Sequence, residues 1–503
     1  PANVMRHRLG TDQRDDICVY READAGFFVS IDDTRSGRFV IISAHDHETS
    51  ECWLIPAHAP EAAPICVAPR TLGIEYDVDD DVNNNALVIV TNWAPEGRAE
   101  DFLVATAPVP TRDADMSSWQ ILRAHTPGCL VLDAVPFANF TAFLVRENAL
   151  PRILVENKTT GETSAIDFPE EAYDLSFGAM GQYDTATLRF IYASMTTPAQ
   201  TIDYDMGTQA RNIRKRQSVP SGHDPAMYIT RRITAVSHDG AEVPVSVLHH
   251  RDTPLDGSAP VLLYGYGSYG ITIPASFSVT RLSLVDRGFI YAIAHIRGGK
   301  ARGHSWFTQG RGAQKTNSFE DFAATARALI ARGWTQPGNI TVHGGSAGGL
   351  LVGATVNLAP ELFRAGVAEV PFVDVLTTML DDTLPLTPPE WPEWGNPIES
   401  AKAYAIIKAY APYENIRATN YPHILATGGL TDPRVTYWEP AKWVARLRAR
   451  RTDDGLTLLR TEMTAGHGGK AGRFNQLHEI AFVYAFVIFV HTGFRGNNND
   501  NGL

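Results

Sequence analysis

Two patterns of hydrophobic residues follow one another along the 503-residue sequence, and the change between them lies near residue 220. Before that point, short β-type runs alternate with turn residues. After it, longer apolar runs alternate with segments of helical pattern. A chain of this length is too long for one hydrophobic core. The change therefore predicts two domains of different fold class, 1–220 and 221–503.

The first pattern predicts an all-β domain. Residues 27–55 hold three short runs, with a hairpin turn at 34–37, and similar groups of runs occupy 74–106, 129–157 and 187–205. Short strands at this spacing are typical of a sandwich or a propeller. A repeat of about 45 residues favours propeller blades, and a domain of this size then holds roughly five blades, incomplete at the N-terminus.

The second pattern predicts a mostly parallel, doubly wound sheet with helices on both faces. Continuous apolar runs, of the kind buried on both faces, occur at 243–250, 261–267, 289–296, 340–345, 366–372, 423–429 and 456–463. Helical patterns lie between several of them, at 318–333, 347–360 and 439–450. The polar, charged segment 206–227 is the expected linker between the domains.

Charge and cysteine content exclude some classes of partner. A net charge of −12 argues against nucleic acid, because a phosphate backbone is bound by clustered Lys and Arg. The four cysteines lie in the first 130 residues without C-x-x-C spacing, so neither a disulfide framework nor a zinc site is expected. The His45-Asp46-His47 stretch, with Cys52, could suggest a metal site, but it lies at an apparent hairpin tip and lacks a fourth ligand at a usual spacing, so we expect no metal and no cofactor. A reducing, cytoplasmic location follows.

The two ends of the sequence carry no targeting signal that we recognise. The longest apolar run, near 480–490, is shorter than a membrane span and contains Tyr484, so we expect a buried terminal helix and no membrane partner. The sequence begins at Pro1 without an initiator Met and shows no signal peptide, so we expect a fragment or a processed product.

One short motif, Gly344-Gly345-Ser346-Ala347-Gly348, indicates chemistry. It lies between an apolar strand and a helical segment, and it lacks the Lys of a phosphate-binding Walker loop. The G-x-S-x-G pattern in this context is a nucleophile elbow, in which a serine stands on a strained turn between strand and helix. Ser346 is therefore the candidate nucleophile.

A serine nucleophile needs a base and a carboxylate that orients the base. In chains with this elbow the two partners follow the serine in the order Asp, His, each beyond a later strand. Asp432 follows the predicted strand 423–429, and His467 follows the predicted strand 456–463. Their order and position predict a triad of Ser346, Asp432 and His467.

The longer motifs resemble the prolyl oligopeptidase family of serine peptidases. The resemblance rests on GGSAGG at the elbow and on YGYGSYG, IRGG, VPFVDVLTTMLDD, EWGNP, YWEPAKWV and GHGGKAGRF elsewhere in the second half. The EWGNP and YWEPAKW stretches look like the oligopeptidase B branch. The resemblance implies an α/β-hydrolase domain capped by a seven-bladed propeller, of which this chain lacks the N-terminal arm and the first blades.

The resemblance also implies roles for single residues. Ser346, Asp432 and His467 match the family's triad, and the Tyr266 hydroxyl with the backbone N–H of Ala347 would form the oxyanion hole. Arg434 matches an arginine that grips a substrate carbonyl.

The oligopeptidase B branch cleaves after Arg or Lys and meets the basic side chain with carboxylates. Glu390 stands where the first of these acids is expected, whereas Pro392 replaces the second. Two acids associated with the next subsite fall on Pro274 and Ser276. Tyr269 and Trp391 would line the wall of the specificity pocket.

Three functions remain open from the sequence. The first is an endopeptidase that acts on short peptides with basic residues. The second is an esterase or exopeptidase with the same triad. The third, from another class, is a propeller that binds partners and carries an inactive hydrolase domain. A separate N-terminal piece that completes the propeller is a further expected partner.

Overall fold

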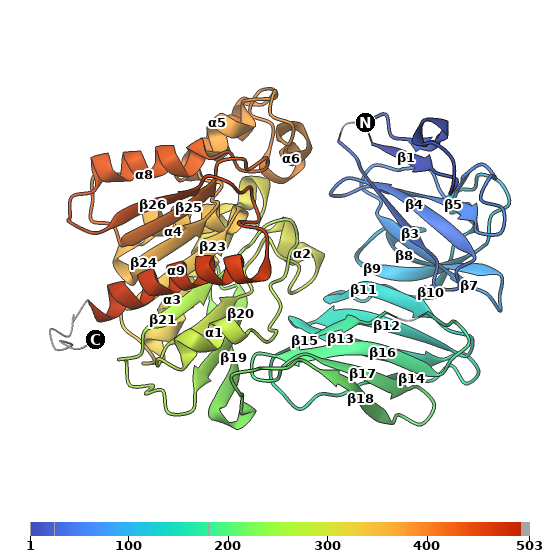
Figure 1. Ribbon diagram of the computed structural model, residues 1–503, viewed down its shortest axis with the longest axis horizontal. Coiled ribbons are helices and arrows are strands. Elements are labelled where there is room, and N and C mark those ends of the chain that lie inside the picture. The colour runs from blue at the N-terminus through green and yellow to red at the C-terminus, as the bar shows by residue number, and fades with distance from the viewer. Residues whose placement is uncertain (1, 25, 180, 494–503) are drawn as a thin grey trace.

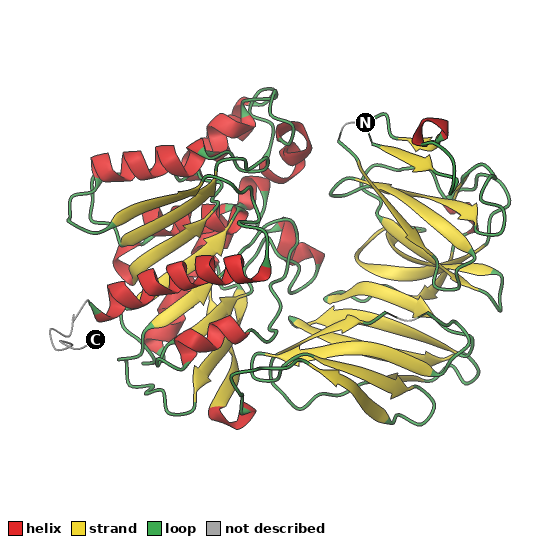
Figure 2. Ribbon diagram, viewed as in Figure 1, coloured by secondary structure: helices red, strands yellow, loops and turns green. Residues whose placement is uncertain are grey.

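The computed structural model, which describes residues 2–24, 26–179 and 181–493, consists of an all-β domain beside an α/β domain (Figure 1, Figure 2). The all-β domain holds the N-terminal half of the chain. The α/β domain follows it and carries the elbow motif. This is the fold class predicted from the sequence.

The all-β domain is built from four antiparallel sheets of four strands and one two-stranded sheet. Each four-stranded sheet takes its strands from consecutive chain segments, as propeller blades do. The strands are β1 (Asn3–Arg6), β2 (Ile17–Arg21), β3 (Phe28–Asp33), β4 (Phe39–His45), β5 (Ser50–Pro56), β6 (Ile65–Cys66), β7 (Tyr76–Asp81), β8 (Ala86–Ala94), β9 (Gly97–Pro108), β10 (Gln120–Arg123), β11 (Cys129–Pro136), β12 (Phe140–Glu147), β13 (Leu150–Asn157), β14 (Thr163–Ala165), β15 (Tyr173–Phe177), β16 (Thr187–Ser194), β17 (Gln200–Asp205) and β18 (Arg211–Arg216).

The predicted turn at 34–37 joins β3 to β4, as expected. The predicted linker was too long at its start. Residues 211–216 form β18, the outer strand of the last blade, and all six are exposed. A fully exposed outer strand carries no alternation of apolar and polar residues, so its sequence looks like a linker.

The α/β domain contains one eight-stranded sheet in the order β19-β20-β22-β21-β23-β24-β25-β26. The β19–β20 and β20–β22 pairs are antiparallel, and every later pair is parallel. The strands are β19 (Tyr228–Val236), β20 (Glu242–His250), β21 (Val261–Tyr264), β22 (Ile290–Ala294), β23 (Ile340–Gly345), β24 (Phe363–Glu369), β25 (His423–Gly429) and β26 (Thr457–Glu462).

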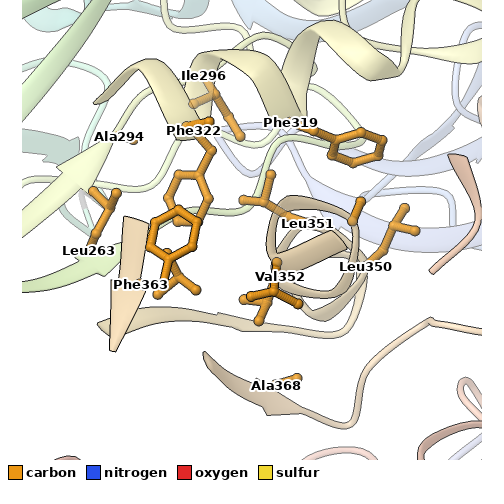
Figure 3. Packing of buried hydrophobic residues seen from close by; sticks show 14 of the residues in the cluster. Leu263, Ala294, Ile296, Phe319, Phe322, Leu350, Leu351, Val352, Phe363 and Ala368 are labelled. Atoms are coloured by element: carbon orange, nitrogen blue, oxygen red, sulfur yellow. The ribbon is translucent and has the colours of Figure 1, made fainter. Parts of the chain in front are cut away.

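Helices cover both faces of this sheet (Figure 2). They are α1 (Val279–Val285), α2 (His304–Thr308), α3 (Thr316–Ala331), α4 (Ala347–Leu358), α5 (Val375–Met379), α6 (Thr387–Trp394), α7 (Ala401–Tyr410), α8 (Trp438–Arg450) and α9 (Arg473–Thr492). One core lies between the sheet and α3, α4 and α8, and Figure 3 shows Phe322 of α3 and Leu351 of α4 packed in it. A second core lies between the other face and α1 and α9.

Helix α9 is buried along one face only. Val483, Phe486, Val487 and Val490 belong to the second core, whereas Phe474 is 75% exposed. The prediction of a buried terminal helix is therefore right for the inner face alone. By length and composition, residues Phe474–Thr492 form a helix that could cross a membrane, the one such helix in the described part of the chain.

The topology gathers the predicted functional residues at one edge of the sheet. Strands β23, β25 and β26 are parallel, so the loops that follow their carboxyl ends meet at the same edge. Ser346, Asp432 and His467 lie in or just beyond these loops.

Candidate active site

Ser346 lies on a strained turn between β23 and α4. Its φ of 57° and ψ of −121° place a non-glycine residue in a region that L-amino acids rarely occupy. The surrounding structure holds it there, because the Ser346 N–H donates to the Glu369 carbonyl at 2.8 Å and the Ser346 carbonyl accepts from the N–H of Gly349 at 2.8 Å. Such strain is concentrated at functional sites.

The glycines around Ser346 are required by close backbone contacts. A Cβ on Gly344 would overlap the backbone of Gly348, and a Cβ on Gly348 would lie 2.9 Å from the carbonyl oxygen of Gly265. A Cβ on Gly349 would overlap Pro371. The motif is therefore a tight strand-to-helix crossing, as the sequence predicted.

Asp432 and His467 form a hydrogen-bonded pair. Asp432 Oδ2 lies 2.7 Å from His467 Nδ1. The other carboxylate oxygen, Oδ1, accepts from the backbone N–H of Arg434 at 2.8 Å and from that of Val435 at 3.0 Å. These two donors fix the carboxylate, which in turn orients the imidazole.

Ser346 and His467 line one cavity of about 300 Å³. The serine and the imidazole thus line the same cavity, the carboxylate holds the far side of the ring, and the Ser346 side chain is hydrogen-bonded to Tyr266. A triad of this composition works by moving the serine proton to the imidazole.

Tyr266 and Ala347 stand beside the serine. A hydrogen bond joins the side chains of Tyr266 and Ser346, and burial raises the pKa of Tyr266 to about 12, so its phenol stays protonated at neutral pH and can donate. Ala347 is the first residue of α4, where backbone N–H groups have no acceptor within the helix. Both predicted oxyanion donors are thus placed next to Ser346.

A second cavity, of about 430 Å³, also opens at Ser346. Its wall includes Tyr269 and Glu390, whose side chains are joined by a hydrogen bond of 2.7 Å from the tyrosine hydroxyl to Glu390 Oε2. The same oxygen accepts from Trp394 Nε1 at 2.8 Å. Two donors thus hold one carboxylate oxygen in place. Glu390 is the acidic side chain on the described lining of this cavity.

The structure corrects one expectation about this cavity. Trp391 is absent from its described lining and donates its Nε1 hydrogen to the Met379 carbonyl instead. Residues 387–394 form helix α6, where neighbouring positions point about 100° apart, and Glu390 lies on the cavity wall whereas Trp391 does not. Arg434 lies on the lining as expected for a substrate contact, with an exposed side chain, whereas Pro274 and Ser276, the positions that lack the acids of the next subsite, lie outside it.

Two buried charged residues support the loop that carries Tyr266, and the sequence did not indicate this role for either. Glu393 is 1% exposed and accepts from the Tyr269 N–H at 3.1 Å, so it holds the loop and does not face the cavity. Lys315 is 2% exposed and donates to Gly267 O at 2.5 Å and to Ser268 Oγ at 2.8 Å. Burial lowers the pKa of Lys315 to about 8. Both residues fix the loop that carries Tyr266.

Two propeller residues, Phe28 and His47, also line the larger cavity. The sequence placed His47 at a hairpin tip but gave no reason to bring that tip to the elbow, because the contact spans more than 200 residues. Among the described residues, no group of three or more His, Cys, Asp or Glu side chains is arranged to hold a metal ion.

Two family models match most of the chain. Residues 275–491 match the prolyl oligopeptidase family, and residues 2–217 match the prolyl oligopeptidase N-terminal beta-propeller domain. Dipeptidyl aminopeptidase BI of Pseudoxanthomonas mexicana is 41% identical over 96% of this chain and 66% of its own length. Protease 2 of Moraxella lacunata is 38% identical over 97% of this chain and 69% of its own length.

The fold of oligopeptidase B from Leishmania major superposes with a TM-score of 0.91 at 35% identity, covering 97% of this chain and 68% of that one. The chain thus spans about two thirds of the length of the relatives and structures that it matches.

Proposed function

Because the chain belongs to the prolyl oligopeptidase family, we propose that it is a serine endopeptidase that hydrolyses short peptides after Arg or Lys. The observation that carries this proposal is the elbow serine in a shared cavity with an imidazole that a fixed carboxylate orients. The proposed nucleophile is Ser346, the general base is His467, and Asp432 orients the base.

The proposed reaction has two steps. The Ser346 hydroxyl attacks the scissile carbonyl as His467 takes its proton, and His467 then gives that proton to the leaving amine, which leaves an acyl-enzyme. Water enters and repeats the sequence to release the new carboxylate. The Tyr266 hydroxyl and the Ala347 N–H stabilise the oxyanion in both steps, and one such donor contributes roughly 3 kcal/mol.

Glu390 supports the preference for a basic side chain. One carboxylate oxygen is held by Tyr269 and Trp394, which leaves the second to meet a guanidinium or ammonium in the cavity. With Pro392 in place of a second acid, the pocket offers one carboxylate, so Arg should gain a smaller advantage than two acids would give it.

A further cavity, of about 720 Å³, supports cationic substrates. Six aspartates of the propeller lie on its wall, together with Glu75 and with the cations Arg35 and Lys300; the aspartates are Asp32, Asp33, Asp46, Asp77, Asp79 and Asp133. Burial raises the pKa of Asp79 to about 7 and that of Asp133 to about 6, so the negative charge of this wall grows as the pH rises through neutrality. Such a wall attracts peptides that carry Arg or Lys.

An exopeptidase is the second candidate, and the name of one relative favours it. The dipeptidyl aminopeptidase of Pseudoxanthomonas mexicana is 41% identical to this chain. An enzyme of that kind would require a free amino group on its substrate, whereas the endopeptidase proposed above would also cleave a blocked peptide.

A panel of substrates tests both candidates. We expect kcat/KM to be higher for Arg than for Phe or Pro at the cleaved bond, with blocked peptides accepted. Glu390→Gln should lower the Arg-to-Phe ratio about tenfold, since one charge-assisted hydrogen bond is lost. Glu399→Gln, an exposed acid outside the cavity lining, is the matched control. Equal rates for Arg and Phe in the unchanged protein would refute the specificity, and cleavage of unblocked peptides alone would favour the exopeptidase.

We also propose a cytoplasmic location, since the free cysteines Cys52 and Cys66 are buried and unpaired. A separate N-terminal piece is a proposed partner. The sheet of β1 and β2 has two strands where each other propeller sheet has four, so it offers edges on which further strands can pair. Intact mass and size-exclusion measurements on purified material would show whether such a piece travels with the chain.

A further inference from the structure

The turn between β4 and β5 of the propeller is held in one conformation by its own hydrogen bonds. Asp46 Oδ1 accepts from the N–H of Glu48 at 2.7 Å and of Thr49 at 2.6 Å, and the Asp46 N–H donates to the Thr49 carbonyl at 3.0 Å. The turn therefore presents its two remaining side chains, His47 and Glu48, in fixed directions.

Both side chains reach across to the α/β domain. Glu48 pairs with Arg311 at 2.5 Å, and the side chains are 30% and 21% exposed. The His47 ring stacks on Tyr269, with centroids 5.7 Å apart and an interplanar angle of 29°. These contacts bring the turn against the cavity wall that carries Glu390, and Figure 1 shows the blade that holds β4 on the side of the α/β domain that carries α6.

His47 carries an unused polar atom at this cavity. Its ring lines the cavity that opens at Ser346, and its Nε2 is buried with no hydrogen-bond partner among the described residues. Buried polar atoms are nearly always paired, so an exception requires a reason. A ligand group that enters the cavity would supply the missing partner.

We propose that His47 is a substrate-binding residue contributed by the propeller, with Nε2 hydrogen-bonded to the peptide that occupies the cavity at Ser346. Tyr269 is shared by the two specificity elements: its ring supports the imidazole, and its hydroxyl holds Glu390. The ion pair of Glu48 with Arg311 keeps the turn in place. The binding site is thus complete only when the propeller lies against the α/β domain. This inference rests on the proposed peptidase function.

Substitutions at position 47 test the inference. The unpaired atom is the substrate contact, so His47→Phe, which keeps a stacking ring, should raise KM for an Arg peptide and lower kcat/KM about tenfold, or about 1.4 kcal/mol. His47→Gln loses the ring but keeps a hydrogen-bonding group, and it should lose less than threefold. Glu48→Gln should lower kcat/KM about threefold, and less so in high salt. His58→Ala, at an exposed position of the same blade and outside the lining of the three cavities described above, is the control and should remain within twofold.

The rate of labelling by a small fluorophosphonate separates the outcomes. All of these variants should be labelled at the rate of the unchanged protein, because the reagent needs only the serine and its base. Failure of the unchanged protein to be labelled would refute the peptidase function itself. Normal labelling with unchanged KM in His47→Phe would overturn the role of His47 and leave the peptidase function intact.

Discussion

Asp432→Asn tests how the imidazole is oriented. In the structure, Oδ1 of Asp432 accepts from two backbone N–H groups, at 2.8 and 3.0 Å. An asparagine must keep its carbonyl oxygen there, since a flipped amide would aim its N–H₂ at both donors. The amide nitrogen then faces His467 Nδ1, where the carboxylate had accepted at 2.7 Å.

This exchange reverses the direction of one hydrogen bond. His467 Nδ1 must accept from the amide, so the ring proton moves to Nε2, which can no longer take the proton of Ser346. Loss of the correct tautomer in a triad of this type costs about 10⁴ in kcat, which corresponds to about 5 kcal/mol of transition-state stabilisation.

The assay is kcat for a peptide substrate at saturation, together with the rate of labelling by a fluorophosphonate. We expect both rates to fall by about 10⁴, with KM and thermal unfolding close to those of the unchanged protein because the two loop hydrogen bonds survive. An Asp432→Asn protein within tenfold of normal activity would refute the assigned role of the carboxylate.

Three other changes follow from the same contacts. Tyr266→Phe should lower kcat about 10²-fold with little change in KM, because a donor to the oxyanion is lost. A rise in KM with an unchanged kcat would argue against that role. Gly349→Ala would press a methyl group into Pro371 and should lower the free energy of unfolding by about 1–3 kcal/mol in urea titrations. Burial raises the pKa of Glu439 to about 7 from 4.5. The stability that this raised pKa contributes is present below about pH 4.5 and is lost as the pH rises through 7. The free energy of unfolding of the unchanged protein, taken relative to that of Glu439→Gln, should therefore be lower at pH 8 than at pH 5. An equal difference between the two proteins at both pH values would contradict this.

Local sequence patterns predicted the positions of helices and strands whose residues pack regularly against the core. The expected helix at 318–333 is α3 at Thr316–Ala331, and the expected strand at 423–429 is β25 with the same bounds. Glycines that permit a close crossing mark the elbow once a strand precedes them and a helix follows, and the expected placement of Asp432 and His467 follows from parallel strands.

The remaining features depend on contacts between distant segments. Residues 387–394 contain three prolines, at positions 388, 389 and 392, and resemble a loop, yet they form α6; Pro388 and Pro389 lie in its first turn, where a missing N–H costs nothing. Glu393 is buried because packing brings the Tyr269 N–H to it from 124 residues away. His47 reaches the cavity only through the docking of two domains. None of these contacts leaves a periodic pattern in the sequence.

The central claim is that Ser346 is a nucleophile activated by His467. It is tested most directly by incubating the folded protein with a fluorophosphonate and locating the adduct by peptide mass spectrometry. The account predicts one label per chain, on Ser346, with no label in Ser346→Ala and a much slower reaction in His467→Ala. Folded protein that stays unlabelled, or that is labelled at another residue, would contradict it.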